Sequence, residues 1–321
     1  MFSAMTSLAG RYRLDSRIDT GGYAEVWRAE DTVLARPVAV KILRPEVAAE
    51  PSILDRFRHQ ALCAASLVHE SVTKIFDYEE CTDGHPPFVV MELVDGPSLA
   101  GVLAGGSLEP LRTLDIIART AVGLDAVHRA GLIHSGISPH TILLSSDGLV
   151  KLASFGISRA FGTTPLTPPG TLLGSGYLAP ERLHTDESTV ASDLYALGMV
   201  GYECLAGVLP FTVPVAGPQR AYPLPPLPLT VPAEVAGLIS ELTASDPARR
   251  PHSAVDVAVK AGGLRDRMSG LARRIPAQAR PAVPAQARPA GVPGRARGSH
   301  RRSAGEATRP MPVVTPEPCS R

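Results

Sequence analysis

LIHSGISPHT, residues 132–141, is a short loop between two segments with clear secondary-structure signals. Before it, residues 111–129 have apolar residues at the spacing of one helix face. After it, residues 141–152 have the pattern of a tight hairpin that turns at Asp147-Gly148. A helix, a loop rich in Gly, Ser and His, and a hairpin therefore follow one another here.

The chain before this loop is predicted to be rich in strands. Residues 13–18, 25–28 and 38–43 are rich in β-branched and apolar side chains, which favours strands. Residues 51–67 predict a helix that begins at a proline, and residues 88–93 predict a further strand.

The chain after the loop is predicted to be mainly helical. Residues 190–205 are apolar on nearly all sides, which is typical of a helix inside a core. Residues 233–242 and 253–261 predict two more helices, the second of which closes the domain. From residue 264 onward Pro, Ala and Arg dominate, and such a composition predicts disorder because it buries little apolar area.

Eight motifs run through these elements in a fixed order. They are Gly21-Gly22-Tyr23-Ala24-Glu25-Val26, Val38-Ala39-Val40-Lys41, Val90-Met91-Glu92-Leu93, the loop 132–141, Ser154-Phe155-Gly156, Ala179-Pro180-Glu181, Asp193 with Gly198, and Arg249-Arg250-Pro251. On these motifs the chain resembles bacterial protein kinases of the eukaryotic type, the Ser/Thr kinase family. The resemblance implies an α+β, two-lobed fold over residues 11–263. It comprises a β-rich N-lobe at about 11–93 and a larger helical C-lobe at about 97–263, and a disordered tail follows at 264–321.

Several matching residues have structural roles in this family. The resemblance implies that Glu181 pairs with Arg250, which fixes the activation segment to the C-lobe. It also implies that Asp193 bonds the backbone of the catalytic loop, because a buried carboxylate needs donors. His134 and Phe155 are expected in an internal apolar column.

A second group of matching residues would bind a nucleotide. The resemblance places an adenine ring between apolar side chains, a hinge beside it, and a lysine and glycines at the phosphates. The candidates are Lys41, Gly21, Gly22, Val26, Ala39, Met91, Glu92 and Leu143. Lys41 is the one charged catalytic residue that the chain keeps.

The catalytic loop has lost the residues that react. Gly136 stands where the family has its catalytic aspartate, and it has no side chain. Ser138 replaces the catalytic-loop lysine, and Thr141 replaces the asparagine that binds the second metal ion. The resemblance therefore implies that the chain lacks a general base.

Three further positions depart from the family pattern. Ser154 replaces the main metal-binding aspartate, and Gln60 replaces the helix glutamate that orients the lysine. Asp19 replaces the first glycine of the phosphate loop, which places an anion toward the phosphates. Magnesium prefers carboxylate and phosphate oxygens, so we expect no metal site.

These losses favour a pseudokinase, a regulatory or scaffold module with weak or no ATP binding. A missing general base costs about 10²–10⁴ in rate, roughly 3–5 kcal/mol. The alternative is an ATP-dependent Ser/Thr kinase of low or unusual activity. A third reading, a nucleic-acid binder, depends on the basic tail alone, whose arginines lack interleaved aromatics.

Charge and composition give the remaining expectations. Residues 264–321 have 12 Arg, no Lys and 3 acids, a net charge of +9, whereas the whole chain has +1, so the tail can contact polyanions weakly. We expect a protein partner, such as an active kinase or a phosphate-reading domain. The four widely spaced cysteines show no zinc or disulfide pattern, and a cytoplasmic location is expected. Any bound cofactor should be ATP, without strong dependence on magnesium.

Overall fold

The computed structural model describes residues 6–21, 24–80, 85–153, 175–183, 188–210 and 224–274. Gly22, Ser154 and Phe155 lie outside this set, as do residues 275–321. Predictions on these positions are therefore not examined by the structure.

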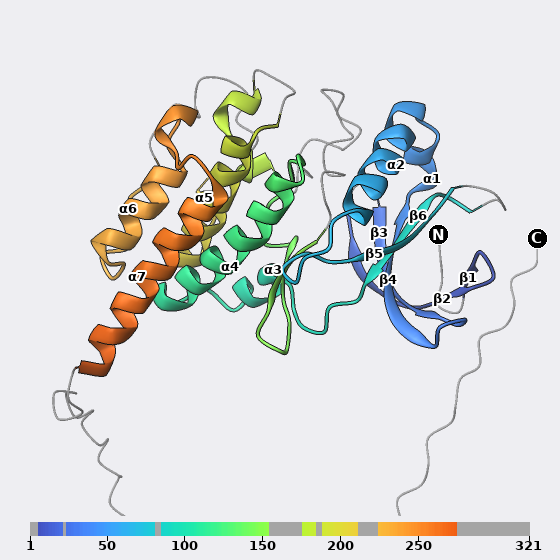
Figure 1. Cartoon of the computed structure of the whole chain (residues 1–321), viewed down its shortest axis with the longest axis horizontal. Coiled ribbons are helices and arrows are strands. Elements are labelled where there is room, and N and C mark those ends of the chain that lie inside the picture. The colour runs from blue at the N-terminus through green and yellow to red at the C-terminus, as the bar shows by residue number, and fades with distance from the viewer. Residues whose placement is uncertain are drawn as a thin grey trace, which may run out of the picture. The chain divides into compact units, whose positions relative to one another are not determined.

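The N-lobe is an antiparallel sheet that carries two helices (Figure 1). In the described residues its strand order is β1-β2-β3-β4-β6-β5. The strands are β1 Ser7–Leu8, β2 Tyr12–Thr20, β3 Ala24–Asp31, β4 Arg36–Leu43, β5 Ile75–Glu79 and β6 Phe88–Glu92. Helices α1 (Pro45–Ala48) and α2 (Pro51–Ala65) follow β4, and each begins at a proline in its first turn.

The alternation of side chains along β4 divides the sheet into two faces. Val38, Val40 and Ile42 are buried on one face, in a cluster with Trp27. Leu43 is buried on the opposite face, where α2 packs. We call this opposite face the α2 face. Ala39 and Lys41 alternate with Val38 and Val40, so they too lie on the α2 face.

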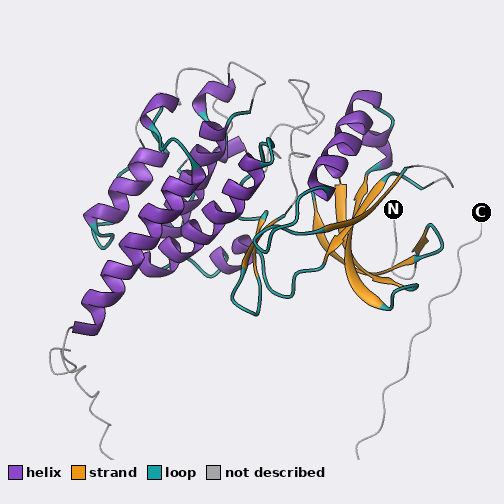
Figure 2. Cartoon of the chain, in the orientation of Figure 1, coloured by secondary structure: helices purple, strands orange, loops and turns teal. Residues whose placement is uncertain are grey.

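The C-lobe is built from helices, with a short hairpin at their edge on the side of the N-lobe, as Figure 2 shows in purple and orange. Its described helices are α3 Leu99–Leu103, α4 Pro110–Arg129, α5 Val190–Ala206, α6 Ala233–Leu242 and α7 Ala254–Arg274. Strands β7 (Ile142–Leu144) and β8 (Val150–Leu152) form the hairpin. The α+β, two-lobed architecture is thus confirmed.

Helix α5 passes through the centre of this lobe. Leu194, Leu197 and Val200 are fully buried in the same cluster as α4 and α6. A Cβ atom on Gly198 would lie 2.6 Å from the Cβ of Leu242. The glycine therefore allows α5 and α6 to pack at a distance that any side chain would prevent.

The boundary predicted between domain and tail needs correction. Helix α7 does not end near residue 261 but continues to Arg274. Leu264 is only 5% exposed and belongs to the main core cluster. Arg265 Nη1 lies 2.8 Å from Oδ1 of Asp115 on α4. Burial of one side of the helix and this ion pair extend the folded domain beyond residue 263, where the tail was expected to begin.

Among the described strands and α-helices, four were not predicted, namely β1, β5, α1 and α3. Strand β5 has the sequence IFDYE, which mixes acidic and aromatic residues and gives no clean alternation. In the described part of the chain, no helix combines the length and apolar character that a membrane crossing requires.

Candidate nucleotide site

The catalytic loop is held by one buried carboxylate on α5. Asp193 Oδ2 accepts a hydrogen bond from the backbone N–H of His134 at 2.8 Å, and Oδ1 accepts one from that of Ser135 at 2.8 Å. Nε2 of His128, on α4, lies 3.0 Å from Asp193 Oδ2. Asp193 is 1% exposed, so these partners supply the donors that a buried carboxylate needs.

The loop backbone carries strain at the residue that this carboxylate binds. Ser135 has a φ of +60°, in the left-handed region that non-glycine residues rarely adopt. A residue there costs about 1–3 kcal/mol, which the surrounding contacts must offset. His134 is fully buried beside it, and burial lowers its pKa to about 4. The ring is therefore neutral at pH 7, with Nε2 3.2 Å from the carbonyl oxygen of Ala153.

The hydroxyl of Thr141 is bound to the loop itself. Thr141 Oγ1 accepts from the backbone N–H of Ser138 at 3.0 Å. The same oxygen lies 2.9 Å from the carbonyl oxygen of Gly136, to which it can donate. Thr141 thus uses the only polar group of its side chain, the hydroxyl, to close the loop, and Gly136 has no side chain. Neither residue offers a side-chain carboxylate or amide that could bind a metal ion or accept the proton of a substrate hydroxyl.

Lys41 lies on β4 on the α2 face and is 4% exposed. Burial lowers the pKa of Lys41 to about 8, and the charge of Asp19 partly offsets this decrease. Gln60 lies on α2, at the position where the resemblance implies a glutamate in the family. Its Oε1 is buried and accepts no hydrogen bond within the described residues. Among the described contacts, therefore, Gln60 Oε1 does not orient the ammonium group as a carboxylate would.

The candidate residues for the adenine ring lie on β3, β4, β6 and β7. Ala39 lies directly opposite Met91 in the sheet, and Val26 lies opposite Lys41. Ala39 and Met91 are buried, whereas Val26 and Leu143 are partly exposed. Exposed apolar edges beside a buried small residue suit the flat faces of an aromatic ring.

An ion pair of the Glu92 side chain links the hinge to the C-lobe. Glu92 Oε1 lies 2.9 Å from the ammonium of Lys151, and its backbone N–H donates to the carbonyl of Lys74 at 2.8 Å. The side chain of Glu92 is thus engaged within the protein. Gly96 approaches β7 so closely that a Cβ atom there would lie 2.0 Å from the Leu144 carbonyl oxygen.

The Glu181–Arg250 pair anchors the segment that follows the undescribed residues 154–174. Arg250 Nη1 and Nη2 donate to the two carboxylate oxygens of Glu181 at 2.6 and 2.8 Å. The guanidinium also donates to the carbonyls of Ala191 and Ala244. Arg250 is 3% exposed and the side chain of Glu181 is 22% exposed, so this is a partly buried, bidentate ion pair.

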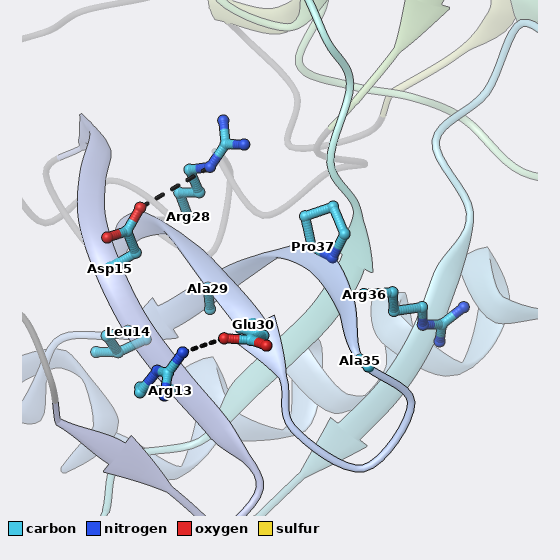
Figure 3. A pocket seen from close by; sticks show the side chains of 9 residues that line it. All are labelled: Arg13, Leu14, Asp15, Arg28, Ala29, Glu30, Ala35, Arg36 and Pro37. Atoms are coloured by element: carbon cyan, nitrogen blue, oxygen red, sulfur yellow. Dashed lines mark hydrogen bonds and ion pairs between the residues drawn. The ribbon is translucent and has the colours of Figure 1, made fainter.

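A cavity of about 440 Å³ opens on the N-lobe sheet away from Lys41 (Figure 3). Arg28 and Glu30 of β3 alternate with Val26 and therefore share the α2 face. The charges at the cavity are paired, Arg13 with Glu30 and Arg28 with Asp15, the latter pair 3.9 Å apart. This surface was not predicted, because the pairing depends on the register of β2 and β3.

Sequence reasoning also missed His128 and the position of Asp19 relative to Lys41. His128 continues the apolar stripe of α4 at Ile117, Ala121 and Leu124, and this spacing is a signal of its inward position. Among the described residues, no three or more His, Cys, Asp or Glu side chains lie together as metal ligands would. An adenine ring fits the residues present, whereas the donors described at the phosphate end are a lysine and neutral hydroxyls.

Comparison with known proteins agrees with this geometry. The protein kinase domain family matches residues 12–259. The Ser/Thr-protein kinase PknA of Mycobacterium tuberculosis is 37% identical over 318 residues, which cover 95% of this chain and 73% of that protein. PknA of Corynebacterium glutamicum is 39% identical over 263 residues, with 79% of this chain and 56% of that protein covered.

A solved structure shows the same architecture. The crystal structure of the Mycobacterium tuberculosis PknI kinase domain superposes with a TM-score of 0.65 at 26% identity, and 82% of this chain and 99% of that chain are covered. The family match spans most of the chain. The chain therefore belongs to the bacterial eukaryotic-type Ser/Thr protein kinase family.

Proposed function

We propose that this protein is a pseudokinase, a kinase-fold module that regulates or scaffolds other proteins and binds ATP weakly or not at all. The observation that carries the proposal is the structure of the catalytic loop. Gly136 provides no base, and the hydroxyl of Thr141 is used to close the loop. Phosphoryl transfer depends on positioning and charge compensation, which these two residues cannot supply.

ATP would meet two different environments in this site. The apolar side chains of Val26, Ala39 and Leu143 can hold an adenine ring, and Lys41 can face a phosphate. When bound, magnesium would supply charge compensation at the phosphates, yet Thr141 offers only a hydroxyl that the loop already uses. Any ATP binding should therefore depend little on magnesium.

A test of phosphotransfer separates the pseudokinase from an active enzyme. The purified chain is incubated with labelled ATP, magnesium or manganese, and a generic protein substrate. No incorporation is expected, and a triple variant with Gly136→Asp, Thr141→Asn and Ser154→Asp serves as the family-like comparison. Autophosphorylation of the wild type that disappears in Lys41→Ala would contradict the proposal.

The second candidate is a Ser/Thr kinase of low or unusual activity. It is favoured by relatives such as PknA, which are named Ser/Thr-protein kinases, and by the buried Lys41 that the chain keeps. In this case the wild type would show slow transfer, lost in Lys41→Ala. The same assay at long incubation times and high enzyme concentration distinguishes the two candidates.

A regulatory module would act through a protein partner, either an active kinase or a domain that reads phosphate. The segment between Phe155 and Ala179 contains four threonines, which lie outside the described residues: Thr163, Thr164, Thr167 and Thr171. Phosphate on one of them would add a charge of about −1.5 to −2 and three acceptor oxygens. Mass spectrometry of the protein from its native host tests this, and no phosphate on residues 157–178 would contradict it.

A further inference from the structure

Asp19, Val26 and Lys41 form a row across three strands of the N-lobe. Asp19 lies opposite Val26 in the β2–β3 pair, and Val26 lies opposite Lys41 in the β3–β4 pair. Directly opposed residues of antiparallel strands project from the same face, about 4.5–5.5 Å apart at each step. The side chains of Asp19 on β2 and Lys41 on β4 therefore lie on the α2 face, with strand β3 between them.

The charges of these two residues interact across the row. Asp19 is exposed at the end of β2, beside the turn to β3, and its Oδ1 accepts from the backbone N–H of Thr20 at 2.7 Å. Its negative charge raises the pKa of Lys41 against the larger, opposite effect of burial. Because both residues lie on the α2 face, the charge of Asp19 acts on the ammonium of Lys41 and favours its charged form.

A phosphate group would compete with this carboxylate. A ligand whose phosphates contact Lys41 would place them on the α2 face, on which Asp19 also lies. There they would meet the negative charge of Asp19, and the ammonium they need is already partly neutralised. A like charge in a partly desolvated site is costly, and the described residues include no metal-ligand cluster to offset it. A nucleoside without phosphate avoids this repulsion and keeps the apolar contacts.

We propose that Asp19 makes this site select an adenosine-like ligand over ATP. The inference rests on the proposed function, because a module that transfers no phosphate does not need a phosphate-binding end. Asp19 acts here as a specificity-determining residue, and the chemical class of ligand is an uncharged purine nucleoside.

The test is calorimetric titration of the full chain with adenosine, ADP and ATP, each with and without magnesium. In the wild type, affinity should fall in the order adenosine, ADP, ATP. Asp19→Asn keeps the size of the side chain and removes its charge. It should raise ATP affinity about tenfold or more, roughly 1.4 kcal/mol, and leave adenosine affinity unchanged.

Asp15→Asn is the matched control. Asp15 lies on the same strand about four residues, or roughly 13 Å, from Asp19, and it faces Arg28 in the cavity of Figure 3. The control changes the net charge by the same amount but should leave ATP affinity within about twofold of the wild type. An equal gain in both variants would show a general charge effect and overturn the proposal.

Other results would also overturn it. These are tighter wild-type binding of ATP than of adenosine, no ATP gain in Asp19→Asn, or no adenosine binding to either protein. A loss of ATP affinity in Asp19→Asn only when magnesium is present would make Asp19 a metal ligand instead. Failure of the proposed function is separate, because it would appear as phosphotransfer by the wild type whatever the order of ligand affinities.

Discussion

The C-lobe anchors and the phosphate end of the cleft differ in how their polar groups are satisfied. Asp193 accepts from two backbone N–H groups and lies in bonding distance of His128, and Arg250 binds both oxygens of Glu181. At the phosphate end, Gly136 has no side chain, and the buried Oε1 of Gln60 has no partner in the described structure. The comparison teaches that the polar groups that hold the C-lobe can be fully paired while a buried polar group beside the cleft stays without a partner in the described structure.

The strongest way to challenge this contrast is to remove an anchor. Arg250→Ala removes the fully buried guanidinium that binds both oxygens of the partly buried Glu181 carboxylate, which costs about 3–5 kcal/mol. At about 2–4 °C per kcal/mol for a domain of this size, Tm should fall by roughly 10 °C. Arg129→Ala is the control, because its pair with Asp125 is exposed on α4 and should contribute under about 1 kcal/mol. Equal effects of the two variants would mean that the buried pair is not an anchor.

Acid should lower the free energy of unfolding, because His134 is buried in its neutral form in the folded protein. Burial lowers the pKa of His134 to about 4, below the ordinary value of about 6.5. The unfolded chain therefore binds more protons in this range, so stability is full above pH 6.5 and is lost as pH falls toward 4. The loss should reach about 3 kcal/mol, measured by urea unfolding at several pH values.

Two histidine variants identify the source of this pH dependence. His134→Gln should be less stable than the wild type at pH 7 but should show a shallower loss between pH 6.5 and 4. His140→Gln, at an exposed position of the same loop, should keep the wild-type slope. If His134→Gln also keeps the wild-type slope, another group accounts for it.

A pair of truncations tests where the anchored region ends. Removing residues 264–321 deletes the buried Leu264 and the partner of Asp115, and it should cost about 2–3 kcal/mol. Removing only residues 275–321 deletes none of the described core and should leave Tm nearly unchanged. Thermal unfolding of both proteins measures the difference, and equal Tm values would place the end of the domain near residue 263 after all.

The smallest effect is expected at the phosphate end. Thr141→Val keeps the shape of the side chain but leaves the Ser138 N–H and the Gly136 carbonyl without this hydroxyl. The loop is partly exposed, so water can replace part of the loss, and the cost should be about 1–2 kcal/mol. Thr141→Ser keeps the hydroxyl and should be nearly neutral. A loss comparable to that of Arg250→Ala would remove the contrast between the two regions.

Much of the fold could be predicted because its signals are local. Helix α6 has the predicted bounds, residues 233–242, since a proline precedes it and its apolar residues are regularly spaced. An apolar pattern in the sequence indicates that α7 continues past residue 261. Val257, Ala261, Leu264 and Met268 continue one apolar stripe through residues whose arginines suggested a tail.

The site was only partly predictable, because its decisive contacts join distant segments. The resemblance identified Gly136 and Thr141 as substituted, but only the structure shows that the Thr141 hydroxyl is bound within the loop. The row of Asp19, Val26 and Lys41 depends on an irregularity in β2 between Arg17 and Asp19. An extra residue there decides which face the carboxylate takes, and no local propensity fixes that outcome.

Arg250 has a further consequence, for the lifetime of the folded state. Its guanidinium joins Glu181 and Ala191, which are 69 and 59 residues away in the chain. Contacts of such long sequence separation can form only after these segments have met, so we expect them to be largely absent from the folding transition state. Interactions absent from that state slow unfolding while leaving folding almost unchanged. Arg250 is thus expected to govern how long a folded molecule persists more than how fast it forms.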